Sequence, residues 1–342
     1  MSTTSQYVLV TGATGFIGAH VVDVLLSRGC RVRGATRSSS KGDAMIKARP
    51  QYSDKLDFVQ VSDFASGVDF EKAVEGVDAV IHVASPFTYD TKDSEKELII
   101  PAINGVKAIL SAAAVQPSIK RVVLTSSFAS VMDADRKAPP YFTYTGSDWN
   151  PLTYEEAIAP SNPAFIAYRG SKVFAEKAAW DFVKAEKPGF DLVTLCPPMT
   201  FGPVVHPVAR VEDLNESNAM LWEIATSSPS TPLPVARVPF WIDVRDLALA
   251  HVEAVLRPAA GGKRFVPAAT ELFSYGKAAR IIDSEFSWAK GKVPIEEQLI
   301  DESHGLDGET AARELGLQYR TFKETVSDLV AQVYDIQRRT KV

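Results

Sequence analysis

The segment YRGSK at 168–172 places a tyrosine and a lysine four residues apart, at the start of a run with a helical pattern. On a helix, residues at this spacing lie on one face about one turn apart, so the ammonium of Lys172 lies near the phenol of Tyr168. A free tyrosine has a pKa of about 10, and a neighbouring cation lowers that pKa because it stabilises the phenolate. The pair therefore suits proton transfer near neutral pH, although the spacing alone is common and mostly structural.

A serine pair, Ser126 and Ser127, ends the strand-like run RVVLTSS. Doubly wound sheets bind ligands at the carboxyl ends of their strands. A hydroxyl placed there can hydrogen-bond a carbonyl oxygen that gains negative charge as hydride arrives. Strand-end serines can also serve only to satisfy backbone groups, but the serine pair, the tyrosine and the lysine together favour chemistry.

Three glycines, Gly12, Gly15 and Gly18, follow the apolar run YVLVT and open a helical pattern. Glycine lets the backbone approach a pyrophosphate, and a helix N-terminus supplies amide donors and positive potential. Glycines at this spacing can also mark a merely tight turn. Their place after the first strand of an α/β chain favours a dinucleotide site.

The stretch ATRSSSK at 35–41 ends the second predicted strand. An NAD enzyme usually presents an acidic side chain to the ribose hydroxyls at this point, whereas this chain offers Arg37 and Lys41. A guanidinium and an ammonium suit a 2′-phosphate, which a carboxylate would repel. We therefore expect NADP in preference to NAD; the alternative is that both cations belong to a solvated surface loop.

These residues need a scaffold that brings strand ends and one helix together. Short β-branched runs alternate with helical patterns through the first two hundred residues, which is typical of parallel strands joined by helices. The strand-like runs lie at 7–11, 31–36, 56–61, 79–84, 121–126 and 192–196, and the helical patterns lie near 16–28, 94–115 and 163–186. Because the strands are almost continuously apolar, the sheet should be covered on both faces. We predict an α/β fold, a Rossmann-type doubly wound parallel sheet.

After Cys196 the chain becomes rich in proline and loops, with shorter helical patterns. We expect a dinucleotide-binding domain over 1–196 that also takes in part of 240–265. A smaller substrate-binding lobe should occupy most of 197–342, threaded back onto the main domain.

Composition excludes several classes of protein. The chain has 342 residues, 46% of them hydrophobic, and a formal net charge of −5. So mild a charge indicates neither nucleic-acid nor membrane binding, and five scattered histidines predict no metal site. Cys30 and Cys196 are interpreted as reduced thiols of a cytoplasmic protein, and the start MSTTSQ lacks the features of a secretory signal. The sequon at Asn215 is incidental in that setting.

Taken together, TGATGFIG, LTSS and YRGSK resemble the extended short-chain dehydrogenase/reductase family. Further blocks are similar to the fungal NADPH-dependent aldehyde and ketone reductases of the methylglyoxal/isovaleraldehyde reductase type, relatives of plant dihydroflavonol and cinnamoyl-CoA reductases. These blocks are SPF at 85–87, IPAINGVKAIL at 100–110, SDWNP at 147–151, SKVFAEKAAWDF at 171–182, FGP at 201–203 and WIDVRDLALAH at 241–251. The resemblance runs nearly end to end.

The resemblance implies an activity and its catalytic residues. A reductase of this family uses NADPH to reduce aldehydes and ketones to alcohols. Ser127 would polarise the substrate carbonyl, Tyr168 would donate the proton, and Lys172 would hold the nicotinamide ribose and tune the tyrosine. Asn104 matches a helix asparagine that holds a structural or proton-relay water in several relatives.

The resemblance also implies how NADPH or NADP⁺ is held. Arg37 and Lys41 would take the 2′-phosphate, Asp63 would reach the adenine, and Pro197 would lie by the nicotinamide. The remaining cofactor residues would be Gly12, Thr14, Gly15, Phe16, Ile17, Gly18, Val83, Ala84 and Ser85, together with Tyr168 and Lys172.

The substrate pocket is expected at Phe87, Met132, Phe165, Met199 and Thr200. A pocket walled by methionine and phenylalanine favours a small hydrophobic carbonyl substrate, although such residues can equally be ordinary core. The resemblance leaves a monomer or a homodimer open, the latter through the helices near 94–115 and 165–186.

Two alternatives remain at this point. One is an NAD-dependent sugar-nucleotide epimerase or dehydratase of the same superfamily. Dehydratases of that kind add acidic residues beside the serine, whereas here the neighbours are Thr125, Ser126 and Phe128. The other is a non-catalytic dinucleotide sensor, which would typically have lost the tyrosine or the lysine.

Overall fold

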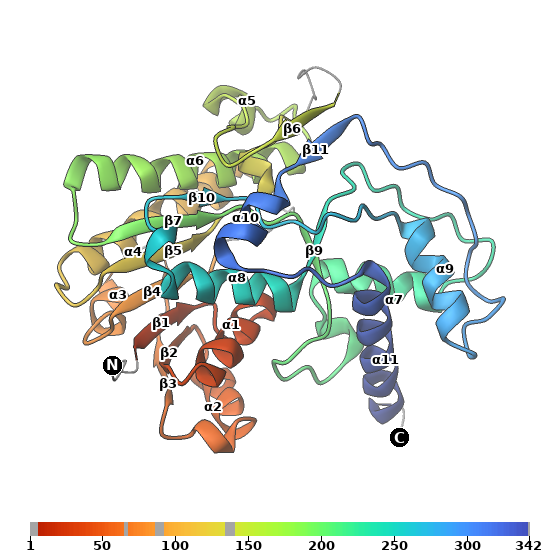
Figure 1. Ribbon diagram of the computed structural model, residues 1–342, viewed down its shortest axis with the longest axis horizontal. Coiled ribbons are helices and arrows are strands. Elements are labelled where there is room, and N and C mark those ends of the chain that lie inside the picture. The colour runs from red at the N-terminus through yellow and green to blue at the C-terminus, as the bar shows by residue number, and fades with distance from the viewer. Residues whose placement is uncertain (1–5, 65–67, 86–91, 134–140, 341–342) are drawn as a thin grey trace.

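The computed structural model of the protein describes residues 6–64, 68–85, 92–133 and 141–340. A seven-stranded, wholly parallel sheet forms its centre, in the order β10-β7-β5-β4-β1-β2-β3 (Figure 1). The strands are β1 (Tyr7–Thr11), β2 (Arg31–Thr36), β3 (Leu56–Gln60), β4 (Ala79–His82), β5 (Arg121–Thr125), β7 (Asp191–Leu195) and β10 (Arg264–Phe265). The order reverses beside β1, which opens a crevice between the ends of β1 and β4. The predicted doubly wound α/β fold is confirmed.

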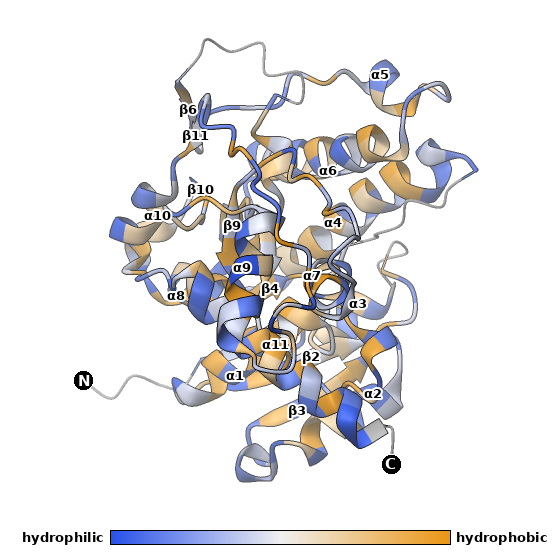
Figure 2. Cartoon of the chain, turned by 90° about the vertical axis from the view of Figure 1, so that its right-hand side faces the viewer, coloured by the Kyte–Doolittle hydropathy of each residue, from blue (hydrophilic) through white to orange (hydrophobic). Residues whose placement is uncertain are grey.

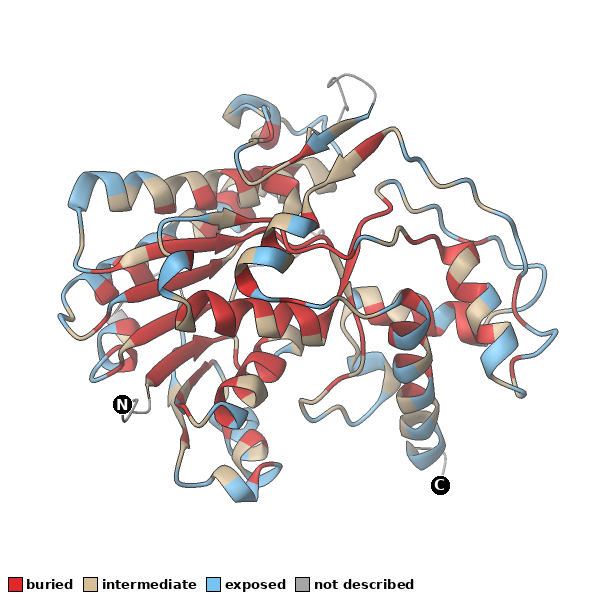
Figure 3. Cartoon of the chain, in the orientation of Figure 1, coloured by how far each residue is buried: buried red, intermediate tan, exposed pale blue. Residues whose placement is uncertain are grey.

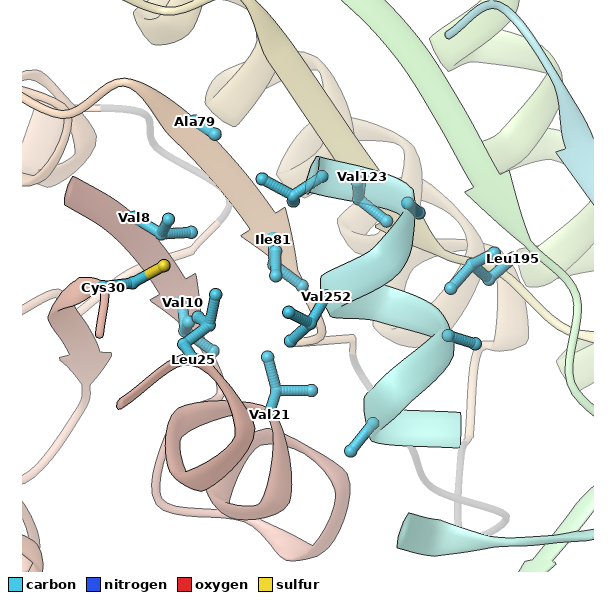
Figure 4. Packing of buried hydrophobic residues seen from close by; sticks show 14 of the residues in the cluster. Val8, Val10, Val21, Leu25, Cys30, Ala79, Ile81, Val123, Leu195 and Val252 are labelled. Atoms are coloured by element: carbon cyan, nitrogen blue, oxygen red, sulfur yellow. The ribbon is translucent and has the colours of Figure 1, made fainter. Parts of the chain in front are cut away.

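Helices cover both faces of the sheet because successive strand residues point to opposite sides. Val8 and Val10 of β1 pack against α1 and α8 on one face (Figure 4). Leu9 points to the other face, where α3, α4 and α6 pack. The covering helices are α1 (Phe16–Ser27), α3 (Val68–Ala73), α4 (Ile100–Ala114), α6 (Ala164–Glu186) and α8 (Val244–Leu256), while α2 (Ser39–Lys47) lies beside β2 and β3. Figure 3 shows the central strands buried and the helices exposed along one side.

The C-terminal part returns to the sheet twice before it completes a smaller lobe. Helix α8 covers the sheet and β10 adds its edge strand, so the 240–265 region contacts the dinucleotide-binding part of the chain. The lobe has its own core, which includes Phe201, Trp241, Phe273 and Phe322. Its elements are α7 (Glu216–Thr226), α9 (Tyr275–Glu285), α11 (Phe322–Thr340) and the parallel pair β8 (Met199–Phe201) and β9 (Trp241–Asp243). In Figure 2 hydrophilic and hydrophobic residues alternate along these helices.

Four further short elements lie outside the central sheet and the core of the lobe. Helix α10 (Gly308–Leu315) packs beside α8, and β6 (Phe142–Tyr144) pairs with β11 (His304–Leu306). Helix α5 (Tyr154–Ile158) precedes α6 and begins with a capping box at Thr153 and Glu156, which satisfies two backbone donors reciprocally.

Within the part of the chain that the structure describes, one helical stretch, Glu95–Ala114, is long and apolar enough to cross a membrane by length and composition alone. Half of its most apolar window is buried inside the protein. Val106, Ile109 and Leu110 pack there in the core beneath the sheet. This burial accounts for the apolar composition as that of a core helix.

Candidate active site

A cleft of about 1240 Å³ runs along the carboxyl ends of the strands and continues beneath the C-terminal lobe. Ligands of doubly wound folds bind at this edge. All the residues predicted to hold the dinucleotide line the cleft: Gly12, Thr14, Gly15, Phe16, Ile17, Gly18, Arg37, Lys41, Asp63, Val83, Ala84, Ser85, Tyr168, Lys172 and Pro197. Ser127 lines it as well.

The glycine turn joins β1 to α1 with no space for side chains at two of its positions. Gly12 has a φ of +67°, and a Cβ there would lie 3.0 Å from the backbone nitrogen of Ala84. A Cβ on Gly18 would lie 2.1 Å from the carbonyl oxygen of Gly12. Gly15, by contrast, is exposed and caps α1 without a side-chain hydrogen bond. The helix N-terminus therefore opens onto the cleft, which suits an anionic pyrophosphate.

Arg37 and Lys41 lie at one end of the cleft, after β2 and in the first turn of α2. Both are exposed, and neither takes part in an ion pair among the residues that the structure describes. The Thr36 hydroxyl accepts a hydrogen bond from the backbone N–H of Ser38 at 3.2 Å, which fixes the turn between them. Two cations at this corner fit a 2′-phosphate.

Tyr168 and Lys172 lie on the first turns of α6 and face the cleft. The Lys172 ammonium is 5.6 Å from the centroid of the Tyr168 ring and donates a hydrogen bond of 2.8 Å to the Ser85 hydroxyl. Burial disfavours the charged ammonium and lowers the pKa of Lys172 to about 8. The lysine is thus anchored by the chain that follows β4 and held beside the phenol.

Ser127 lies in a turn after β5 that is tied to the end of β7. Backbone hydrogen bonds run from the N–H of Ser126 to the carbonyl of Leu195 at 2.7 Å and from Phe128 to Pro197 at 3.0 Å. The Ser127 oxygen accepts a bond from the N–H of Ala129 at 3.2 Å. The serine hydrogen therefore stays available for a ligand oxygen in the cleft.

Two buried histidines fix the neighbouring strand ends. Burial lowers the pKa of His251 to about 4, so the ring is neutral; it donates to the carbonyl of Leu247 and accepts from the Thr125 hydroxyl at 2.7 Å. Burial lowers the pKa of His82 to about 3. Its Nδ1 lies 2.9 Å from the Thr11 hydroxyl, which accepts the N–H of Ala84 at 3.1 Å.

The structure places two of the predicted site residues away from the cleft. Met132 is 5% exposed and packs with Phe240 and Val266 in a separate core, because the short turn after Ser127 directs it away from the cleft. Asn104 is exposed and does not line the cleft. On a helix, residues three and four apart share a face; Ala102, Gly105 and Val106 form the face toward the cleft, and Asn104 lies off it.

The other predicted pocket residues divide into those at the cleft and one that cannot be placed. Phe165, Met199 and Thr200 line the cleft. Phe87 falls outside the described residues.

Several residues that line the substrate end of the cleft were not predicted from the sequence. Asn215, dismissed as part of an incidental sequon, lines the cleft; its Nδ2 donates to the Ser217 hydroxyl at 2.8 Å, and its Oδ1 is buried without a partner in the described structure. Arg237 also lines the cleft, with its guanidinium 5.3 Å from the Phe165 ring. Tyr275 closes this end and is 3% exposed. All three come from loops or helix starts of the lobe, where no periodic pattern predicts orientation.

The fold and cleft define a Rossmann-type protein that places a glycine turn, two cations, a serine, a tyrosine and a lysine around one dinucleotide-sized space. Residues 8–266 match the NAD dependent epimerase/dehydratase family. The chain belongs to this family, that of the extended short-chain dehydrogenases/reductases.

Several relatives match over almost the whole chain. The uncharacterized oxidoreductase C513.07 of Schizosaccharomyces pombe is 37% identical over 334 residues, 96% of this chain and 97% of the relative. The ketoreductase azaE of Aspergillus niger is 33% identical over 347 residues, 98% of this chain and 99% of the relative. A crystal structure of yeast methylglyoxal/isovaleraldehyde reductase Gre2 complexed with NADPH has a TM-score of 0.88 at 33% identity, covering 97% of this chain and 99% of that one. The predicted resemblance is confirmed.

Proposed function

We propose that this protein is an NADPH-dependent reductase that converts aldehydes and ketones to alcohols. The observation that carries this proposal is that Ser127, Tyr168 and Lys172 line the same cleft as the glycine turn and its cationic corner. The named relatives support it, since one is a ketoreductase and another is a methylglyoxal/isovaleraldehyde reductase solved with NADPH.

The cofactor fits this cleft by the chemistry of its walls. The open N-terminus of α1 would hold the pyrophosphate, and Arg37 and Lys41 would hold the 2′-phosphate. Asp63 would reach the adenine and Pro197 would adjoin the nicotinamide. Bound NADPH supplies the hydride that adds to the carbonyl carbon.

Residues of the chain stabilise the negative charge that develops on the carbonyl oxygen and supply the proton that it receives. Ser127 donates a hydrogen bond to that oxygen, and the bond strengthens as negative charge develops. Tyr168 transfers its phenolic proton to the same oxygen and becomes a phenolate. The Lys172 ammonium, 5.6 Å from the ring centroid, stabilises the phenolate until solvent returns a proton.

The substrate end of the cleft has mostly apolar walls. Phe165, Met199, Met220 and Phe273 line it. Methionines adapt to ligands of different shape, so we propose small carbonyl compounds with an apolar substituent as substrates.

A panel of aldehydes, diketones and ketoesters, followed spectrophotometrically with NADPH and NADH in parallel, tests the proposal. We expect NADPH oxidation with part of the panel and weaker turnover with NADH. NAD that copurifies, with no turnover of added NADPH, would instead favour an epimerase or dehydratase. NADPH binding without turnover of any carbonyl would favour a sensor.

We further propose that the protein acts in the cytoplasm as a monomer or a homodimer. Cys30 and Cys196 are both buried and unpaired, which suits a reducing compartment.

A further inference from the structure

A buried ionic cluster lies directly behind the serine turn. Glu176 is on α6, four residues after Lys172 and eight after Tyr168, so all three share one side of the helix. Its carboxylate accepts hydrogen bonds from Ser126 at 2.6 Å and from Ser130 at 2.5 Å. These serines flank Ser127 on either side. The helix that carries the proton donor is thus joined by one carboxylate to the turn that carries the serine.

Arg264, from the edge strand β10, completes the cluster. Its guanidinium lies 2.7 Å from Glu176, with side-chain exposures of 6% for the arginine and 1% for the glutamate. It also donates to the carbonyls of Ser130 and Gly146 at 3.1 Å and lies 3.9 Å from the centroid of the Trp149 ring. Arg264 of β10 therefore contacts both the Glu176 carboxylate and the turn that carries Ser127.

The protonation states in this cluster are fixed. Burial alone would raise the pKa of Glu176, but the charge of Arg264 and the hydroxyls of Ser126 and Ser130 outweigh it and hold the pKa below its usual value. Burial raises the pKa of Cys196 to about 12, so its thiol stays protonated and donates to Glu176 at 3.5 Å. The carboxylate remains an acceptor throughout the working pH range.

Stability alone does not account for such a cluster. Desolvating two charges costs so much that a well-packed apolar replacement is often equally stable or more stable. An ionic cluster does provide fixed directions, because each hydrogen bond restricts the positions of its two groups. We infer that Glu176 is a positioning residue, which holds the Ser126–Ser130 turn against α6 and so sets where the Ser127 hydroxyl lies relative to the Tyr168 phenol.

This inference rests on the proposed carbonyl reduction, and its test separates the two. Two variants weaken the cluster to different extents: Glu176→Gln removes the charge, and Ser126→Ala removes one hydroxyl while leaving the ion pair with Arg264. The control is Asp191→Asn, which weakens the ion pair between Arg121 and Asp191. This pair lies at the amino ends of β5 and β7, away from the cluster at their carboxyl ends.

The expected result is a fall in kcat with little change in NADPH affinity. Because a displacement near 1 Å costs about 100-fold in rate, we expect about a 100-fold loss for Glu176→Gln and about 10-fold for Ser126→Ala. Asp191→Asn should leave kcat unchanged. The readouts are kcat and KM for the carbonyl, NADPH affinity by fluorescence, and the folded fraction by circular dichroism.

Two outcomes overturn the inference. Folded Ser126→Ala with wild-type kcat shows that the cluster serves stability only, even if Glu176→Gln fails to fold. The inference also fails if crystal structures of Ser126→Ala and wild type show the Ser127 and Tyr168 hydroxyls in the same relative positions. The structures remain informative if wild type turns over no carbonyl, a result that would refute the proposed function alone.

Discussion

An arginine–carboxylate cluster lies near each end of strands β5 and β7, and the two clusters differ in burial and in surroundings. At the amino ends Arg121 and Asp191 form a bidentate pair, at 2.6 and 2.8 Å, with side-chain exposures of 10% and 42%. At the carboxyl ends Glu176 and Arg264 are almost wholly buried. Only the second cluster borders the cleft, through Glu176.

The difference indicates what each end of the sheet is for. The pair at the amino end, of which only Asp191 is substantially exposed, joins two strands to the end of α8, since Arg121 also donates to the carbonyl of Ala254 at 2.9 Å. Burial of the cluster at the carboxyl end carries a desolvation penalty, and the cluster orients a turn in the cleft. Substitutions at the carboxyl end should therefore change rates and affinities, and those at the amino end should change stability alone.

The largest effect is expected from the proton donor at the carboxyl end. Tyr168→Phe removes the phenolic proton, and we expect kcat to fall by about 10² to 10⁴-fold, with NADPH affinity and thermal stability retained. Steady-state kinetics measure kcat, a cofactor titration measures the NADPH affinity, and thermal denaturation measures the stability. Tyr154→Phe is a matched control, because the Tyr154 hydroxyl bonds Glu95 at 3.0 Å outside the cleft. Full activity in Tyr168→Phe would refute the assignment of the donor.

The next largest effect is expected on the preference for NADPH over NADH, which should depend on the carboxyl end of β2 and not on its amino end. Arg37→Glu places a carboxylate against the 2′-phosphate, and we expect NADPH affinity to fall about 100-fold more than NADH affinity, since bonds to charged groups contribute about 1.5 to 3 kcal/mol. Arg31→Glu is the control at the amino end of the strand, where Arg31 is exposed and lies 4.3 Å from the Tyr7 ring centroid. Equal losses for both coenzymes would show that Arg37 is only a surface cation.

A smaller effect concerns pH and the histidine behind the serine turn. The pKa of His251 is about 4 in the folded protein and about 6.5 when unfolded. The unfolded chain therefore takes up the proton first as pH falls, and stability is lost from about pH 6.5 downward. By linkage this histidine accounts for about 2 kcal/mol of the loss between pH 7.5 and pH 5.

Urea denaturation at the two pH values tests this contribution. His251→Gln should show a loss about 2 kcal/mol smaller than wild type. Thr125→Val, which keeps the histidine but removes its hydroxyl partner, should retain the steep pH dependence. Identical pH dependence in wild type and His251→Gln would contradict the prediction.

The sequence could predict the parts of the site that depend on neighbouring residues. Tyr168 and Lys172 share a helix face, and the three glycines lie in one turn, so spacing alone predicts their geometry. Glu176 and Arg264 are 88 residues apart, and only the addition of β10 beside β7 brings them together. That contact has no local signal.

The positions of Asn104 and Met132, both away from the cleft, have the same kind of cause. The helix of Asn104 was predicted, but which of its faces meets the cleft depends on how α4 packs against the sheet. Met132 follows a short turn whose direction is fixed by the bonds of the buried cluster and the end of β7. Local pattern therefore predicts elements and motifs, whereas orientation at their ends depends on tertiary contacts.

The smallest effect is expected at the amino end. Asp191→Asn removes one charge of a pair whose carboxylate is 42% exposed, and exposed pairs contribute about 0.2 to 1 kcal/mol. The free energy of unfolding should decrease by an amount within that range. Raising the salt concentration should reduce this difference between variant and wild type, because salt screens the exposed charge. The kcat and the NADPH affinity should match wild type. If Asp191→Asn lowers kcat as much as Ser126→Ala does, β5 and β7 transmit strain along their whole length, and the separation between a structural and a chemical end of the sheet is wrong.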